Sequence, residues 1–348
     1  MKKSFLFVLT GMIVIQACGG NRDENNENKD TIAAGEIVKD VPVTTSIEIN
    51  ASQAGNLLDT TAVVEELGKG FIWSEGPVWV DALDALLFSD VPANKIYKWS
   101  EKDGLTVFLE PSGKTNPNDS ASLEGSNGLS LDSEGDLILC QHGDRRIASL
   151  TSGVENPQSS FITMAGNFDG KKFNSPNDLA IKSNGDIYFT DPSYGLKDKS
   201  KREIDFHGVY KLTPGGVVSL LLDSLSWPNG IAFSPDEKTL YLANSDKDKA
   251  VWYNYKIDAN GKLKDGKILY DATKASKNGE VGLPDGMKVH KDGTIFATGP
   301  GGIYLISPKG EKLGRIKTSK ATANCAFDKD QKYLYMTTTD RLLRLKLK

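Results

Sequence analysis

The sequence predicts an all-β fold, a six-bladed β-propeller built of four-stranded blades. One hydrophobic strand pattern recurs along the chain, each time opened by an acid or an amide, in the segments SEGPVW, SNGLSL, PNDLAI, PNGIAF and PDGMKV. The opening residues are Glu75, Asn127, Asn177, Asn229 and Asp285, and the successive gaps between them are 52, 50, 52 and 56 residues. A period of this size is typical of propeller blades.

The strands within each repeat indicate the number of blades. After each opening residue the chain runs apolar, turns through a short polar link and resumes as a second strand, as IYFTD follows DLAIK. A third strand follows in six places, namely KIYKW, RIASL, GVYKL, AVWYNY, GIYLI and RLLRLKL. Outer strands such as LTVFLE and KLGRIK complete sets of four. We therefore expect six blades.

The sixth repeat differs from the others at both of its ends. RLLRLKL at 341–347 is a third strand without an outer strand after it. We expect the strand-like run TAVVEEL at 61–67 to supply that strand and close the ring. At the start of the repeat, ANCAFD places Ala323 at the opening position and Asn324 one place late, so this blade is expected to give no ligand.

The N-terminal residues indicate export. Lys2 and Lys3 precede a largely apolar stretch, 5–17, that suits a signal peptide over residues 1–17 and is too short for an ordinary transmembrane helix. Residues 15–18, IQAC, resemble the lipobox of bacterial lipoproteins, in which the cysteine, here Cys18, is lipidated. Plain secretion is the alternative, because Gln16 is unusual in a lipobox. Residues 18–58 are polar and predict a disordered tether to a propeller at 59–348, held at the bacterial cell envelope, in the periplasm or on the outer membrane.

Composition limits the partners. The 348 residues are 39% hydrophobic and 25% charged, as in globular proteins. The formal net charge of −4 becomes −6 when residues 1–17 are removed, so nucleic acid is not an expected partner. We expect a monomer that contacts membrane only through the N-terminal lipid. Cys140 and Cys325 lie in different repeats, which favours two buried free thiols over a disulfide.

The opening residues predict a cation site. Radial repetition directs the same position of every blade at one axis. Two carboxylates, Glu75 and Asp285, would there meet the amide oxygens of Asn177 and Asn229. This hard donor set favours Ca²⁺, with Mg²⁺ or Mn²⁺ next and Zn²⁺ least suited. At any single position the alternative is a turn, because Asn-Gly and Asp-Gly are common turn dipeptides.

Longer stretches carry a resemblance to a known family. SEGPVW, NSPNDLAIKSNGDIYFTDPSYG at 174–195 and GLPDGMKVHKDGTIFATGPGGIY at 282–304 resemble the gluconolactonase and senescence marker protein (regucalcin) family over about residues 58–348. The resemblance implies a six-bladed propeller with one divalent cation on its axis, held by residues matching Glu75, Asn177, Asn229 and Asp285. It also implies an enzyme that hydrolyses small-molecule lactones, a carboxylic ester hydrolase.

In lactonases of this kind the cation polarises the ester carbonyl and a neighbouring carboxylate activates water. Asp285 is the predicted general base; the alternative is that it only orients the water, because a bound cation lowers the pKa of a carboxylate. Asn127, in phase with the ligands, is assigned to substrate hydroxyls or a water, with a simple turn residue as the alternative. Asp178, beside Asn177, is expected to brace its neighbours.

Two more residues are predicted to bind substrate. His142 lies in LILCQHGDRRI, which resembles the family's CEHGNRR segment with Gln141 and Asp144 in place of the usual Glu and Asn. Tyr194 lies in the loop TDPSYG. The alternatives are a structural imidazole for His142 and an exposed loop tyrosine for Tyr194.

Other functions fit the same residues. A hydrolase of phosphotriesters or aryl esters would use the same site, because fold does not fix substrate. A non-catalytic propeller stabilised by calcium, which binds a glycan or a protein partner, would use the same ligands.

Overall fold

A computed structural model describes residues 42–116, 122 and 125–348. The predicted signal peptide at 1–17, Cys18 and the predicted tether up to residue 41 lie outside the described residues. Val43–Lys348 form one compact unit. In the part of the chain that is described, no helix is both long and apolar enough to cross a membrane.

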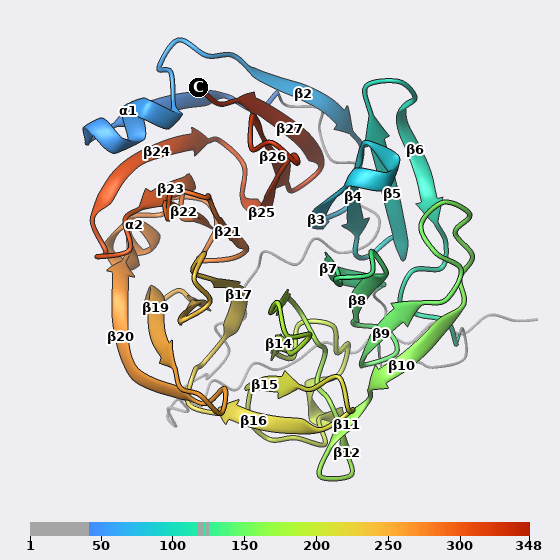
Figure 1. Ribbon diagram of the computed structural model, residues 1–348. Helices are drawn as coiled ribbons and strands as arrows, with labels where there is room; N and C mark the ends of the chain where they lie inside the picture. The colour runs from blue at the N-terminus through green and yellow to red at the C-terminus, as the bar shows by residue number, and fades with distance from the viewer. Residues whose placement is uncertain (1–41, 117–121, 123–124) are drawn as a thin grey trace, which may run out of the picture. The chain divides into compact units, whose positions relative to one another are not determined.

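Six small antiparallel sheets stand around a central axis (Figure 1). The first three blades, from inner to outer strand, are β3 (Ser74–Val80), β4 (Ala85–Asp90), β5 (Lys95–Ser100) and β6 (Gly104–Leu109); β7 (Ser126–Leu131), β8 (Leu137–Gln141), β9 (Arg146–Leu150) and β10 (Phe161–Ala165); and β13 (Leu179–Ile181), β14 (Ile187–Asp191), β15 (Gly208–Leu212) and β16 (Val218–Leu222).

The other three blades are β17 (Pro228–Phe233), β18 (Thr239–Asp246), β19 (Lys249–Ile257) and β20 (Leu263–Asp271); β21 (Met287–Val289), β22 (Ile295–Gly299), β23 (Gly302–Ile306) and β24 (Lys312–Thr318); and β25 (Thr322–Phe327), β26 (Tyr333–Thr338) and β27 (Arg341–Lys346), with β2 (Val64–Lys69) outermost. Short elements between them are η1 (Asp81–Leu83), β11 (Asn167–Phe168), β12 (Lys171–Lys172), η2 (Lys199–Lys201) and α2 (Thr273–Lys277). The predicted six-bladed propeller is confirmed.

The predicted closure of the ring is also confirmed. β2 pairs antiparallel with β27, from Val64 opposite Leu345 to Lys69 opposite Arg341. β2 thereby becomes the fourth strand of the last blade (Figure 1). The sixth blade is completed by a segment far from it in sequence, which removes an open edge.

The tether was predicted too long. β1 (Thr45–Ile49) pairs with β24 and adds a fifth strand to the fifth blade. α1 (Ser52–Leu57) follows, and Ala54, Leu57 and Leu58 are buried against the fifth and sixth blades. The prediction of disorder was wrong from Thr45 onward, because the apolar side chains in this polar stretch are few but have a hydrophobic wall to pack on.

Hydrophobic layers between neighbouring blades hold the ring together. In the described part of the chain, each adjacent pair of blades shares one cluster of buried apolar side chains. Cys140 lies in the layer between the second and third blades, and Cys325 lies in the layer between the fifth and sixth. Both are free and buried, as predicted.

Candidate active site on the propeller axis

The opening residues lie at the N-terminal ends of the inner strands, around the propeller axis. These strands contact one another in the cyclic order β3, β7, β13, β17, β21 and β25, and β25 returns to β3. In four blades the pairing shifts register at the opening position, between Glu75 and Val78, Ser126 and Leu129, Pro228 and Ile231, and Thr322 and Asn324. Such irregularities re-aim side chains away from the regular pleat. In the remaining two blades, Asn177 and Asp285 stand just before β13 and β21.

The glycines after the opening residues are explained by close packing between blades rather than by hairpin turns. A Cβ atom on Gly76 would lie 2.0 Å from the carbonyl oxygen of Asn127, and one on Gly230 would lie 2.1 Å from that of Asp285. Each glycine therefore makes room for the opening residue of the next blade. The turn interpretation fails at these positions for this reason.

Hydroxyl groups on the second strands hold the next blade in place. The donors and the backbone oxygens that accept are Ser89 Oγ to Asn127 (2.8 Å), Thr190 Oγ1 to Asn229 (2.8 Å) and Thr298 Oγ1 to Ala323 (2.9 Å). The last contact places Ala323 where the other blades carry an acid or an amide. The sixth blade therefore presents a methyl group at the opening position.

A chain of amide hydrogen bonds links three of these side chains. Asn127 Nδ2 donates to Asn177 Oδ1 at 2.9 Å, and Asn177 Nδ2 donates to Asn229 Oδ1 at 2.6 Å. Asn229 Nδ2 donates in turn to Ser245 Oγ at 3.1 Å. All four residues are buried. Because each nitrogen is committed to the next residue, the carboxamides are oriented, and each Oδ1 keeps a lone pair for another partner.

Two carboxylates interact across the axis. Gly76 N–H donates to Glu75 Oε2 at 3.0 Å. Burial raises the pKa of Glu75 to about 7, and the hydrogen bond from Gly76 and the nearby Asn324 side chain oppose the shift. Burial also raises the pKa of Asp285 well above its usual value, the charges of Glu75 and Asp178 raise it further, and the nearby Asn229 side chain opposes these effects. The four predicted ligands are thus brought together.

Tyr194 reaches the same place from a long connection. It belongs to residues 192–207, which join β14 to β15 and form the longest of the links between second and third strands. Its ring stacks on Trp227, with 5.0 Å between ring centroids. Its hydroxyl is buried and forms no hydrogen bond of ordinary geometry. Burial raises the pKa of Tyr194, the charge of Asp285 raises it further, and the nearby Ser245 and Asn229 oppose the shift.

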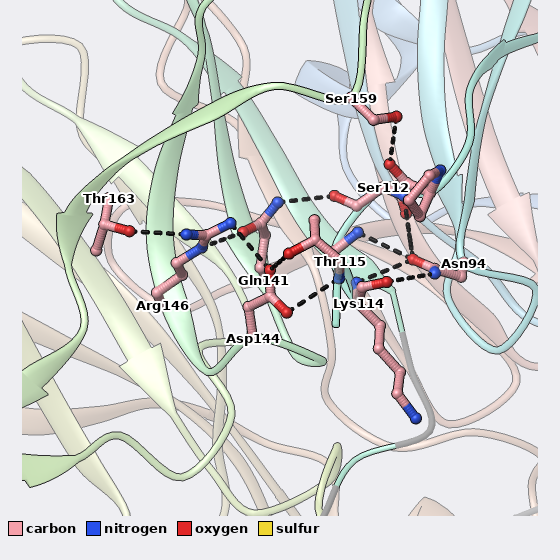
Figure 2. Close-up of polar contacts among 11 residues, drawn as sticks. Asn94, Ser112, Lys114, Thr115, Gln141, Asp144, Arg146, Ser159 and Thr163 are labelled. Carbon is pink, nitrogen blue, oxygen red and sulfur yellow. Dashed lines mark hydrogen bonds and ion pairs between the residues drawn. The ribbon is translucent and has the colours of Figure 1, made fainter. Parts of the chain in front are cut away.

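His142 follows β8 and is buried, with its Nε2 atom 3.4 Å from Asn127 Nδ2. A polar network fixes the turn that carries it (Figure 2). Gln141 Nε2 donates to Ser112 O at 2.9 Å, and Arg146 donates to Gln141 Oε1 at 2.6 Å and to Asp144 Oδ2 at 2.9 Å. Gln141 and Asp144, the two departures from the family segment, therefore both form hydrogen bonds that hold this turn.

Ser245 and Trp227 were not predicted as site residues from their local sequence. Ser245 accepts from Asn229 and donates to the backbone oxygen of Pro284, next to Asp285. Trp227 is only partly buried and packs on Tyr194 and on His207, 4.4 Å away between centroids. Its position directly before Pro228 and Asn229 was the one signal that it belongs to the site.

The donor set fits a divalent cation. Among residues 42–116, 122 and 125–348, no group of three or more His, Cys, Asp and Glu side chains is arranged to hold a metal ion. The candidate set instead mixes two carboxylates with two amide oxygens, which are donors that Ca²⁺ accepts. The charges of Glu75 and Asp285 repel each other and are what a dication would neutralise.

A protein family model matches most of the chain. The model described as "SMP-30/Gluconolactonase/LRE-like region" matches residues 73–340. The chain belongs to this family. The matched span of the SMP-30/gluconolactonase domain contains all five opening residues.

Relatives extend the similarity beyond that span. A gluconolactonase of Zymomonas mobilis is 37% identical over 333 residues, which cover 93% of this chain and 89% of the relative. Human regucalcin is 24% identical over 268 residues, covering 76% of this chain and 82% of the relative. A solved gluconolactonase from Xanthomonas campestris has a TM-score of 0.76 at 30% identity, covering 88% of this chain and 97% of its own. A solved regucalcin from Agrobacterium tumefaciens, at 17% identity and a TM-score of 0.64, covers 82% of this chain and 95% of its own and shares the fold.

Proposed function

We propose that the protein hydrolyses sugar lactones with the help of one divalent cation, Ca²⁺ being favoured, held by Glu75, Asn177, Asn229 and Asp285. The observation that carries the proposal is the convergence of these four oxygen-bearing side chains on the propeller axis. The 37% identity to the gluconolactonase of Zymomonas mobilis supports a lactone as the substrate.

The bound cation would supply a Lewis acid that polarises the lactone carbonyl and offsets the charge growing on its oxygen. Asp285 accepts a proton from the attacking water as the water oxygen bonds to the carbonyl carbon. The bond from this carbon to the ring oxygen then breaks, and the ring oxygen takes the proton back from Asp285 to become the hydroxyl of the product acid. Burial and the charges of Glu75 and Asp178 raise the pKa of Asp285 in the metal-free protein, and a bound cation would lower it again, so that Asp285 is ionised and able to accept the proton.

Three further side chains bind the substrate in this proposal. Asn127 and His142 are buried neighbours beside the ligand Asn177. The ring of Tyr194 stacks on Trp227, two residues before Asn229, and the charge of Asp285 acts on its hydroxyl. Because its pKa is raised, Tyr194 stays protonated and can donate a hydrogen bond to a substrate oxygen.

The test couples metal analysis to hydrolysis. Purified protein is analysed for bound metal, stripped with EDTA and assayed on aldonolactones, aryl esters and a phosphotriester, with and without added Ca²⁺, Mg²⁺, Mn²⁺ or Zn²⁺. We expect about one divalent ion per chain and lactone hydrolysis that EDTA abolishes and Ca²⁺ restores.

The other outcomes identify the alternatives. Hydrolysis confined to the phosphotriester or the aryl esters would overturn the lactone assignment and retain the site. Tight metal binding without hydrolysis of any substrate would overturn the enzymatic proposal in favour of a structural ion. Full lactone hydrolysis by the metal-free protein would overturn the role of the cation.

We also propose that the chain is exported and lipidated on Cys18. Incorporation of radiolabelled fatty acid by expressing bacteria would test this, with Cys18→Ser as the control. Equal labelling of both proteins would contradict the proposal.

A further inference from the structure

The position after each opening residue divides the blades into two classes. Four blades carry glycine there, at Gly76, Gly128, Gly230 and Gly286. The third blade carries Asp178 instead, and the sixth carries Asn324 one place after Ala323. Because the third and sixth blades stand opposite each other in a ring of six, these two side chains approach from opposite sides of the axis.

The two exceptions meet. Asn324 Nδ2 donates to Asp178 Oδ2 at 3.4 Å, and both side chains are buried. Room for this contact comes from Gly286, where a Cβ atom would lie 1.9 Å from Asn324 Cγ. The contact therefore depends on the pattern of glycines around it.

Local hydrogen bonds fix the direction of both groups. Leu179 N–H donates to Asp178 Oδ1 at 2.9 Å, and Cys325 N–H donates to Asn324 Oδ1 at 2.9 Å. The Asn324 nitrogen and the second oxygen of Asp178 are the atoms that remain to meet each other. Donor faces acceptor, so the pair cannot exchange roles without breaking a backbone bond.

The pair also reaches the candidate cation site. Asn324 lies on β25, which packs beside β3, the strand that carries Glu75. The Asn324 side chain lowers the pKa of the Glu75 carboxyl against the larger effect of burial, as a donor close to a carboxylate does. Burial raises the pKa of Asp178, and the positive charge of Lys288 is the largest opposing influence. Asn324 thus lies beside two buried carboxylates, and Lys288 offsets part of the charge of Asp178.

We propose that Asp178 and Asn324 form a cross-axis brace that positions the Glu75 carboxylate for the cation. The inference rests on the proposed cation site and adds two positioning residues to it. Asp178 holds the amide of Asn324, and Asn324 holds Glu75. Groups that orient metal ligands in this way commonly change metal affinity about 10–100-fold when removed.

The experiment measures Ca²⁺ binding to EDTA-stripped full-length protein by calorimetry. Asn324→Ala removes the donor, and Asp178→Asn keeps the shape but sets an amide nitrogen against that of Asn324. Thr294→Val is the matched control, because Thr294 is buried and hydrogen-bonded to Gln53 but forms no contact with the ligands. Thermal melting in EDTA checks that each variant is folded.

We expect both brace variants to weaken Ca²⁺ binding about 10-fold or more and Thr294→Val to change it less than about twofold. In a Glu75→Gln background, Asn324→Ala should add less than about twofold, because the brace acts through Glu75. Saturating Ca²⁺ should return kcat of Asn324→Ala toward that of the parent protein.

Unchanged affinity in a folded Asn324→Ala or Asp178→Asn variant would overturn the brace. Additive losses with Glu75→Gln would overturn its action through Glu75. These results are distinct from failure of the proposed function, which would show as absence of Ca²⁺ binding or of lactone hydrolysis in the parent protein.

Discussion

Two regions of the propeller differ in composition: the ends of the inner strands at the propeller axis, here called the axial ends, and the hydrophobic layers between neighbouring blades, here called the walls. Each wall is a layer of buried apolar side chains, which stabilises the ring by removing hydrocarbon from water. The axial ends bury Glu75, Asp178 and Asp285, whose pKa values burial raises. Burial of an ionised group costs free energy unless it is paired.

Stability and function are therefore separated in this fold. The hydrophobic walls keep the ring closed regardless of which side chains lie at the axis. The axis can therefore hold carboxylates that repel one another. Substitutions on the axis should therefore change ion binding and turnover more than stability. Substitutions in the walls should do the reverse.

The largest effect is expected on the axis. Asp285→Asn should lower lactone hydrolysis by about 10³-fold or more, because it removes the base and one ligand charge. The same change removes repulsion with Glu75, so the melting temperature in EDTA should stay equal or rise. Turnover assays and thermal melts of the same preparation check both statements. Near-normal hydrolysis would remove Asp285 from the mechanism, and a large fall in melting temperature would mean that the axial carboxylates also stabilise the fold.

A wall substitution should give the opposite result. Phe296 is fully buried between the fifth and sixth blades, and Phe296→Ala should lower the free energy of unfolding by about 3–5 kcal/mol. Ca²⁺ affinity of the folded protein should be nearly unchanged, because Phe296 contacts no ligand. Denaturant unfolding and calorimetry measure the two quantities. Val107→Ala on the exposed outer strand β6 serves as the control and should have little effect on either.

The same division explains what could be predicted from the sequence. The strand pattern and its period fix the blades, and the missing outer strand of the last repeat predicted the pairing of β2 with β27. β1 was missed because alternation in TSIEI is short and lies in a polar stretch. Its place depends on β24, a partner far away in the chain.

At the site, the repeat predicted which side chains converge but not how they are held. The register shifts at Glu75 and Asn229 follow from pairing between strands, which no local pattern encodes. The glycines after the opening residues looked like turn signals, and their contacts with the next blade appear only when the ring is closed. Tyr194 was predicted at the site from its loop, whereas Trp227, whose ring stacks on it, was not predicted there.

An intermediate effect is expected from pH. Burial raises the pKa values of Glu75 and Asp191 to about 7, and each acid is therefore more easily ionised in the unfolded chain. Their contribution to stability is complete below the unfolded pKa, near 4, and is lost as the pH rises through about 7. His207, whose pKa burial lowers, acts in the other direction, because protonation below about pH 6.5 disfavours the fold.

Melting temperatures in EDTA should accordingly fall between pH 5 and pH 8. The increase in melting temperature caused by Ca²⁺ should grow over the same range, because the ion binds the ionised carboxylates. Glu75→Gln should reduce both trends and leave the part due to the other buried acids, Asp178, Asp191 and Asp285. A metal-free protein that becomes more stable from pH 5 to pH 8 would contradict the assignment of raised pKa values.

The smallest effect is expected where the axis meets the loop over it. Tyr194→Phe keeps the ring stacked on Trp227 and removes only the buried hydroxyl, which forms no ordinary hydrogen bond in the protein. Stability should therefore change little or improve slightly, whereas kcat/KM for a lactone should fall about tenfold if the hydroxyl donates to the substrate. Trp227→Leu, which removes the platform and keeps the hydroxyl, should also lower kcat/KM because the tyrosine is no longer held. A Tyr194→Phe variant with unchanged kcat/KM would assign the tyrosine to the wall rather than to the site.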